Sequence, residues 1–286
     1  MDSWYITYER PIGGVGSALL SITSDGSSLL EISGPVSSIG LPDKQEIGEY
    51  RAIIPTEMAN SLKSMTLAAI REANKHNEPQ LPGTPFLQMG YGIDGNAPDS
   101  LGVIPLSVQM PAEITQLQNA ILPVMKKLLE YPSNALHGNA QCKSDILPSG
   151  KDLELICEFS STGTDPVIFE NPLNPGSGNS TMELWIEKIA DNKEHISVDD
   201  DDVIIPLTVQ QISLLSGLKS DSSACELKPG QKIKFLIRPR RTVYMSSGQY
   251  SVVIRYKSNV EDNLSEAGGI SGTLRISAGK FTVKQK

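Results

Sequence analysis

The spacing of apolar residues changes near residue 145, and this change constrains the fold more than any other feature of the chain. Before it, two stretches with helical spacing lie among short segments that alternate apolar and polar residues. After it, almost every segment alternates with a period of two, which is typical of half-buried strands. The pattern predicts an α+β N-terminal domain followed by an all-β sandwich.

The first half contains short alternating segments and the Ser24-Asp25-Gly26 turn signal, which together predict a sheet. The candidate strands lie at residues 4–9, 17–22, 29–32, 49–54, 86–89 and 103–108. The first predicted helix opens at residues 55–57 with Thr56 as its N-cap, and Met58 and Leu62 lie on its apolar face.

The second predicted helix starts around Pro111, and Pro123 lies inside its apolar stripe. Proline lacks an amide donor and clashes with the preceding turn, so we expect a kink or a break near Leu122. Both helices are amphipathic, which favours packing on one face of a sheet.

The segment at residues 133–151 is polar and contains Gly138, Pro148 and Gly150, as expected between domains. A chain of 286 residues is long enough for two domains, each with its own core. The sequence predicts a small α+β domain at 1–140, with two helices on a sheet, a linker at 141–149 and a sandwich at 150–286.

Two segments of the second half carry a resemblance to a known family. Leu227-x-Pro229-Gly230 precedes a predicted strand, and Gly248-x-Tyr250-x-Val252-x-Ile254-x-Tyr256 forms a late one. Over roughly residues 150–284 the chain resembles bacterial immunoglobulin-like β-sandwich domains. The resemblance implies an all-β immunoglobulin-like sandwich, without the family's disulfide pattern, and it implies no particular function, because such sandwiches have many roles.

Charge and composition exclude several partners. The formal net charge of −8 at pH 7 argues against a general nucleic-acid-binding protein, which needs a basic face. No apolar run approaches the length of a membrane span, and residues 1–5 lack the features of a secretory signal. We therefore expect a cytoplasmic protein that binds neither nucleic acid nor membrane.

The three cysteines are Cys142, Cys157 and Cys225. An odd, sparse set without CxxC spacing is typical of reduced thiols in the cytoplasm, although one Cys142–Cys225 bridge stays an alternative. Cys157 lies between Leu155 and Phe159 in an alternating segment, so we expect it in the core.

No catalytic or cofactor motif is present in the sequence. Residues 12–16 are glycine-rich but lack the GxGxxG spacing, so a hairpin connection is expected there. His76, His137 and His195 form no HExxH motif, and there is no GxSxG motif. We therefore expect no catalytic residues, no cofactor and no metal. A dyad of His137 with Cys142 stays open, because only tertiary contact decides it.

Two features are candidates for a partner-binding site. If Leu184 and Ile186 face the core, Trp185 lies on the outer face between Glu183 and Glu187, which suits an interface hot spot; the opposite register would place Trp185 in the core. The second feature is an acidic run of four residues, which would favour a cationic partner. This run consists of Asp199, Asp200, Asp201 and Asp202. A solvated loop or a Ca²⁺ site is the alternative, although the spaced DxDxDG pattern is absent.

A basic cluster lies in the second half, and its simplest interpretation is the outward face of a strand, with phosphate or nucleic-acid binding as the alternative. Its members are Lys228, Lys232, Lys234, Arg238, Arg240 and Arg241.

The absence of catalytic motifs and a general likeness to bacterial toxin-immunity proteins predict a non-enzymatic, protein-binding module. Its most concrete form is an acidic immunity protein, free of cofactors, that occludes a cognate toxin by binding a cationic toxin domain. Two alternatives from other classes are a hydrolase or carbohydrate-active enzyme with an accessory β-sandwich, and an adaptor or structural component of a secretion or surface assembly. The sequence specifies neither the partner nor the oligomeric state.

Overall fold

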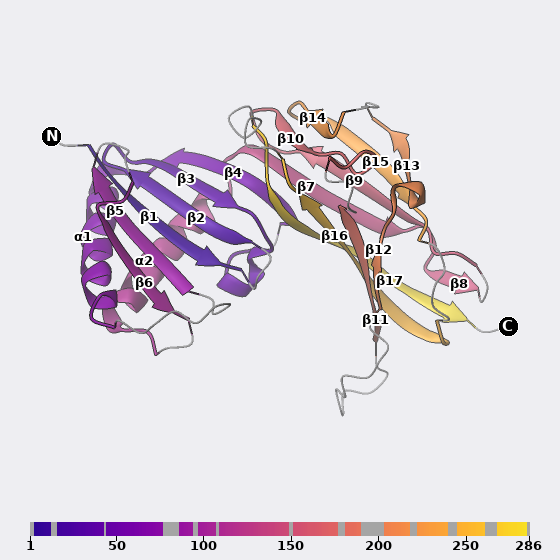
Figure 1. Ribbon diagram of the computed structural model, residues 1–286, viewed down its shortest axis with the longest axis horizontal. Helices are drawn as coiled ribbons and strands as arrows, with labels where there is room; N and C mark the ends of the chain where they lie inside the picture. Colours follow the sequence, from indigo (N-terminus) through magenta and orange to yellow (C-terminus); the bar gives the residue numbers. More distant parts are fainter. Residues whose placement is uncertain are drawn as a thin grey trace. The chain divides into compact units, whose positions relative to one another are not determined.

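The computed structural model is mostly β-sheet, with 52% strand, and is consistent with a β-sandwich-like fold (Figure 1). It describes residues 3–12, 16–42, 44–76, 86–93, 97–106, 109–148, 151–176, 181–189, 203–217, 222–239, 245–260 and 268–284. Contacts divide the chain into two compact units, Met1–Ala135 and Leu136–Lys286. Both α-helices of the described residues lie in the first unit. Neither is long and apolar enough to cross a membrane.

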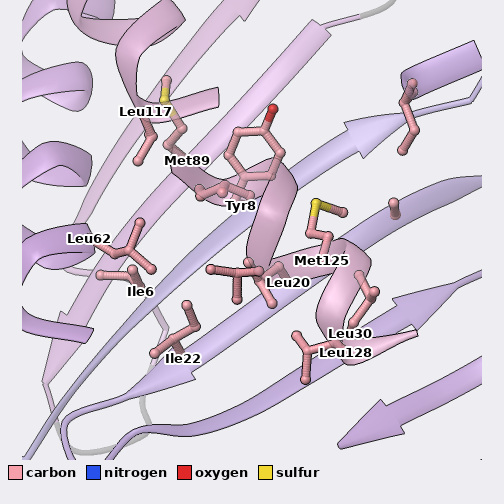
Figure 2. Close-up of a cluster of buried hydrophobic side chains, with 14 of the residues drawn as sticks. Ile6, Tyr8, Leu20, Ile22, Leu30, Leu62, Met89, Leu117, Met125 and Leu128 are labelled. Atoms are coloured by element: carbon pink, nitrogen blue, oxygen red, sulfur yellow. The ribbon is translucent and has the colours of Figure 1, made fainter. Parts of the chain in front are cut away.

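The first unit is an antiparallel sheet with two helices on one face. Its strands are β1 (Trp4–Pro11), β2 (Ser17–Thr23), β3 (Ser27–Ile32), β4 (Glu46–Ile53), β5 (Phe86–Ile93) and β6 (Ser100–Pro105), in the order β4-β3-β2-β1-β5-β6. Its helices are α1 (Thr56–Ala73), α2 (Ala112–Leu128) and the short 3₁₀ helix η1 (Val36–Ile39). Alternate residues of β1, β2 and β3 are buried, and Figure 2 shows Ile6, Tyr8 and Leu20 meeting helix residues such as Leu62 and Leu117.

Helix α1 differs from its prediction in its N-cap and in one residue of the predicted apolar face. Pro55 is the N-cap, in extended conformation, and Thr56 is the first helical residue, so the predicted cap is wrong by one position. The buried face carries Leu62 as expected, but Met58 is exposed. Close packing depends on Gly102 of β6, where an added Cβ would lie 2.8 Å from the Cα of Ile70.

Helix α2 continues through Pro123 as one helix, so it is not broken near Leu122, and the alternative of a kink there stays a prediction. Pro123 has no amide hydrogen to donate to the carbonyl of Asn119, four residues earlier in the helix. Both residues are exposed. Water can therefore hydrate that carbonyl, which explains why the helix need not end there. Pro111 is the N-cap and Ala112 the first helical residue, in agreement with the predicted start around Pro111.

The second unit is all strand apart from one short 3₁₀ helix among its described residues. Its elements are β7 (Pro132–Cys142), β8 (Ile146–Pro148), β9 (Leu155–Ser161), β10 (Val167–Glu170), β11 (Met182–Ile189), β12 (Val203–Pro206), η2 (Val209–Gln211), β13 (Ile212–Ser216), β14 (Ala224–Leu227), β15 (Lys232–Ile237), β16 (Gly248–Ser258) and β17 (Gly272–Lys284). The strands follow the orders β13-β15-β9-β7, β12-β11-β16-β17-β8 and β10-β14, and β8 alone pairs in parallel within these sheets, with β17. Strand β7 crosses the division, so residues 132–135 belong to the first unit.

A cluster of aromatic rings lies in the core of the second unit. Phe159 lies 5.7 Å from both Phe169 and Phe235, and 4.7 Å from Tyr256, measured between ring centroids. Cys157 is fully buried beside them, as the alternation predicted. Tyr256 donates a hydrogen bond of 2.5 Å to the Glu170 carbonyl, which satisfies its hydroxyl inside the core.

Candidate functional site

Strand β11 places Trp185 on the outer face of its sheet. Leu184 and Ile186 are buried, whereas 37% of the Trp185 surface is exposed. Because successive side chains of a strand point to opposite faces, Glu183 and Glu187 share the outer face with Trp185. The structure thus brings three of the predicted site residues together on one strand.

The neighbours of Trp185 come from two other strands. Its Cα partners are Ile204 on β12 and Val253 on β16. Ile204 is 55% exposed, and Val253 is half-buried. Trp185 therefore lies in the middle of a short apolar row that crosses three strands. We call Trp185, Ile204 and Val253, together with Glu183 and Arg255, the Trp185 face.

Charged side chains hold the indole ring against the sheet. The guanidinium of Arg255 lies 5.4 Å from the centroid of the Trp185 ring. The same guanidinium lies 3.8 Å from the Glu183 carboxylate, to which the indole Nε1 donates at 3.4 Å. These contacts favour one orientation of the exposed ring.

The remaining residues of the predicted site are Glu187 and the acidic run. Glu187 is exposed on the outer face of β11, beyond Trp185. The acidic run, Asp199, Asp200, Asp201 and Asp202, lies outside the described residues. Its place relative to the Trp185 face therefore stays a prediction.

Sequence reasoning missed Ile204, Val253 and Arg255. The alternation of residues 248–256 already indicated that Val253 and Arg255 point outward, since Tyr250 and Ile254 point inward. No local signal indicated that β11 pairs with β12 and β16, because strand pairing is a long-range property.

The register of β7 excludes the dyad of His137 and Cys142. The pairing with β9 is regular from Leu136 to Cys142. His137 and Cys142 are five positions apart, so their side chains point to opposite faces of the strand. Burial, followed by the nearby Asp145 charge, also raises the pKa of Cys142 to about 11, which keeps this side chain a neutral thiol at pH 7.

All three cysteines are free thiols, so the alternative Cys142–Cys225 bridge is not formed. Burial raises the pKa of Cys225 to about 11. Across the described residues, no group of three or more His, Cys, Asp or Glu side chains is placed to hold a metal ion.

Three members of the basic cluster, Lys232, Lys234 and Arg238, form ion pairs with Glu158 of β9 or with Glu154, the residue before it. Glu158 accepts from Lys232 at 2.8 Å and lies 2.9 Å from Lys234. The hydrogen bond from Lys232, then that from Lys234, lowers the pKa of Glu158. Glu154 likewise pairs with Lys143 at 2.7 Å and Arg238 at 2.6 Å. The outward orientation expected for these strand residues is therefore correct; Arg240 and Arg241 lie outside the described residues.

Comparison with protein-family models finds no match, and comparison with curated proteins finds none either. Among solved structures, one similar chain is AvmM, which catalyses macrocyclization in alchivemycin A biosynthesis. The alignment covers 53% of this chain and 89% of that chain, at 6% sequence identity and a TM-score of 0.23. At these values the similarity assigns neither a fold family nor a function.

Proposed function

We propose that this protein is a non-enzymatic, protein-binding module that meets its partner with the Trp185 face. The observation that carries the proposal is an exposed tryptophan held in place by Arg255 and Glu183. Tryptophan is enriched among the residues that dominate interface energies, and it is most effective when its surroundings exclude water. Ile204 and Val253 supply such apolar surroundings.

The proposed partner is a protein with a cationic surface. Glu183 and Glu187 flank the indole, the acidic run follows β11 in sequence, and the whole chain has a net charge of −8. Opposite charge accelerates encounter and suppresses wrong partners. The most concrete form of the proposal is a bacterial immunity protein of the cytoplasm whose C-terminal unit is an immunoglobulin-like sandwich that occludes a cognate toxin.

The first prediction concerns Trp185→Ala. The protein encoded by the neighbouring open reading frame is the candidate partner, because an immunity protein is expected beside its toxin. If this protein binds the wild-type chain in calorimetry, Trp185→Ala should raise the dissociation constant at least tenfold, which is about 1.4 kcal/mol. The matched control is Leu215→Ala, which shortens an exposed apolar side chain on β13 and should leave the affinity unchanged. Equal affinity of Trp185→Ala and wild type would exclude the Trp185 face as the interface.

A further inference from the structure

Strand β6 is the end strand of the sheet in the first unit. In the order β4-β3-β2-β1-β5-β6 it has one neighbour, β5, and the two pair antiparallel from Ser100 to Pro105 without a shift of register. An end strand has backbone amides and carbonyls that its own sheet does not use, so another strand can pair with it.

The hydrogen bonds of β1 fix the pattern of the sheet. The Ser24 amide donates to the Trp4 carbonyl, and the Ile12 amide donates to the Gly16 carbonyl. In the register of β1 with β2, these bonds assign the even-numbered residues of β1 to β2. Because a strand alternates its bonds between its two neighbours, the odd-numbered residues of β1 bond to β5.

The same alternation identifies the unused groups of β6. The odd-numbered residues of β1 lie opposite even-numbered residues of β5, so the odd-numbered residues of β5 bond to β6. Their partners are Ser100, Gly102 and Ile104. The amides and carbonyls of Leu101 and Val103 therefore point away from the sheet, and neither residue has a backbone hydrogen bond on that side to another described residue.

The side chains of Leu101 and Val103 lie on the face opposite to the helices. Ile104 is fully buried, and the space above Gly102 is filled by Ile70 of α1, so the even-numbered residues of β6 face the helices. Leu101 is 44% exposed and Val103 is half-buried. The free edge thus combines unused backbone groups with two apolar side chains.

The other end strands of the described sheets are short or irregular, whereas β6 is neither. Strand β13 shifts its register between Leu214 and Ser216, β12 has four residues, and β8 has three. Such features protect edges from pairing, as do charged residues. The six residues of β6 include no charged residue, and Pro105 at the end of the strand is its one protective feature.

These properties favour a second copy of the same strand as the occupant. Leu101 and Val103 are symmetric about Gly102, so a two-fold axis at Gly102 places Leu101 of each copy opposite Val103 of the other. Each outward amide then meets an outward carbonyl, and the two apolar side chains of each pair lie on one face. No like charges of β6 meet, and Pro105, which has no amide to donate, stops the pairing beyond this short symmetric register.

We propose that two copies of this chain associate by antiparallel pairing of β6 with β6, which continues the sheet of the first unit from one copy into the other. Such an interface is isologous, because the same residues contribute from both sides. It belongs to a different unit from the Trp185 face and does not depend on it.

The first test is sedimentation equilibrium of the full-length chain across the micromolar range, where we expect a monomer–dimer equilibrium. Val103→Pro removes an outward amide that β5 does not use, and proline is tolerated at such edge positions. It should raise the dissociation constant roughly tenfold or more, as should Leu101→Glu, which brings two carboxylates into the interface. The matched control is Leu215→Ser, at an exposed leucine of the end strand β13, which should leave the equilibrium unchanged.

The second test concerns the register. Leu101→Cys and Val103→Cys are made separately, each together with Cys142→Ser, and the two proteins are mixed under mild oxidation. Opposite residues of a hydrogen-bonded pair have Cα atoms about 5.5 Å apart, which a disulfide can bridge. We therefore expect more disulfide-linked dimer in the mixture than in either protein alone. The proposal is overturned if the wild type is monomeric throughout, if Leu101→Glu with wild-type circular dichroism dimerises as the wild type does, or if mixing gives no additional cross-linking.

Discussion

Asp25 stabilises the turn between β2 and β3. Its carboxylate accepts from the Thr23 hydroxyl at 2.5 Å, and from the amide and the hydroxyl of Ser27, each at 3.0 Å. The bond from Thr23, followed by those from Ser27, lowers the pKa of Asp25 from 3.8 to about 2. A carboxyl group with a lower pKa in the folded state stabilises the fold above its unfolded pKa, and this contribution is lost as pH falls through the folded pKa.

We therefore predict that Asp25→Asn flattens the acid side of the stability profile. The melting temperature of the wild type should fall more steeply than that of the variant between pH 3.8 and about pH 2, because only the wild type has this carboxylate to protonate. Thermal melts at closely spaced pH values measure the difference between the two chains. Thr23→Val removes one of the three donors and should give an intermediate slope. Parallel profiles for wild type and Asp25→Asn would contradict the assignment.

At the scale of the element, α2 contains a proline in its interior that should reduce its stability. Pro123 cannot donate to Asn119, and proline in a helix interior costs about 3 kcal/mol relative to alanine. Part of this cost is offset because proline also restricts the unfolded chain. Pro123→Ala is therefore expected to raise the free energy of unfolding by about 1–3 kcal/mol in urea titrations. Asn119→Ala, at an exposed position of the same helix, is the control and should change stability by less than about 0.5 kcal/mol. A neutral or destabilising Pro123→Ala would mean that contacts of the ring outweigh the missing hydrogen bond.

At the scale of the whole molecule, the position of β7 decides where the chain can be divided. Residues 136–142 of β7 pair with 155–161 of β9 in the second unit. A fragment that begins at residue 150, the start of the predicted sandwich, removes this neighbour and leaves β9 with an unpaired edge. Such edges favour aggregation.

Accordingly, residues 136–286 expressed alone should fold, with β-type circular dichroism and cooperative thermal unfolding. Residues 150–286 should melt at a lower temperature or aggregate. Size-exclusion chromatography and circular dichroism of both fragments make the comparison. If both fragments are unfolded, the second unit depends on the first; if both melt alike, β7 is dispensable and the boundary at 141–149 is adequate.

Alternation predicted that Trp185 lies on the face opposite to Leu184 and Ile186, and it left open which of the two faces is buried. In the structure Leu184 and Ile186 are buried and Trp185 is exposed, because burial of the larger apolar set selects the register. The same reasoning placed Cys157 in the core. It was less accurate for α1, where Met58 is exposed, since a helical stripe is broad and packing against a sheet decides which part of it is covered.

The sequence by itself determined the mostly β character of the chain, the two helices and the facing of strand residues, because these follow from local periodicity. Only the tertiary structure placed Ile204 and Arg255 beside Trp185 and separated His137 from Cys142. The physical reason is the range of the interactions. Spacing along the chain reports which face a side chain occupies, whereas strand pairing and packing, which act between distant segments, decide what that side chain meets.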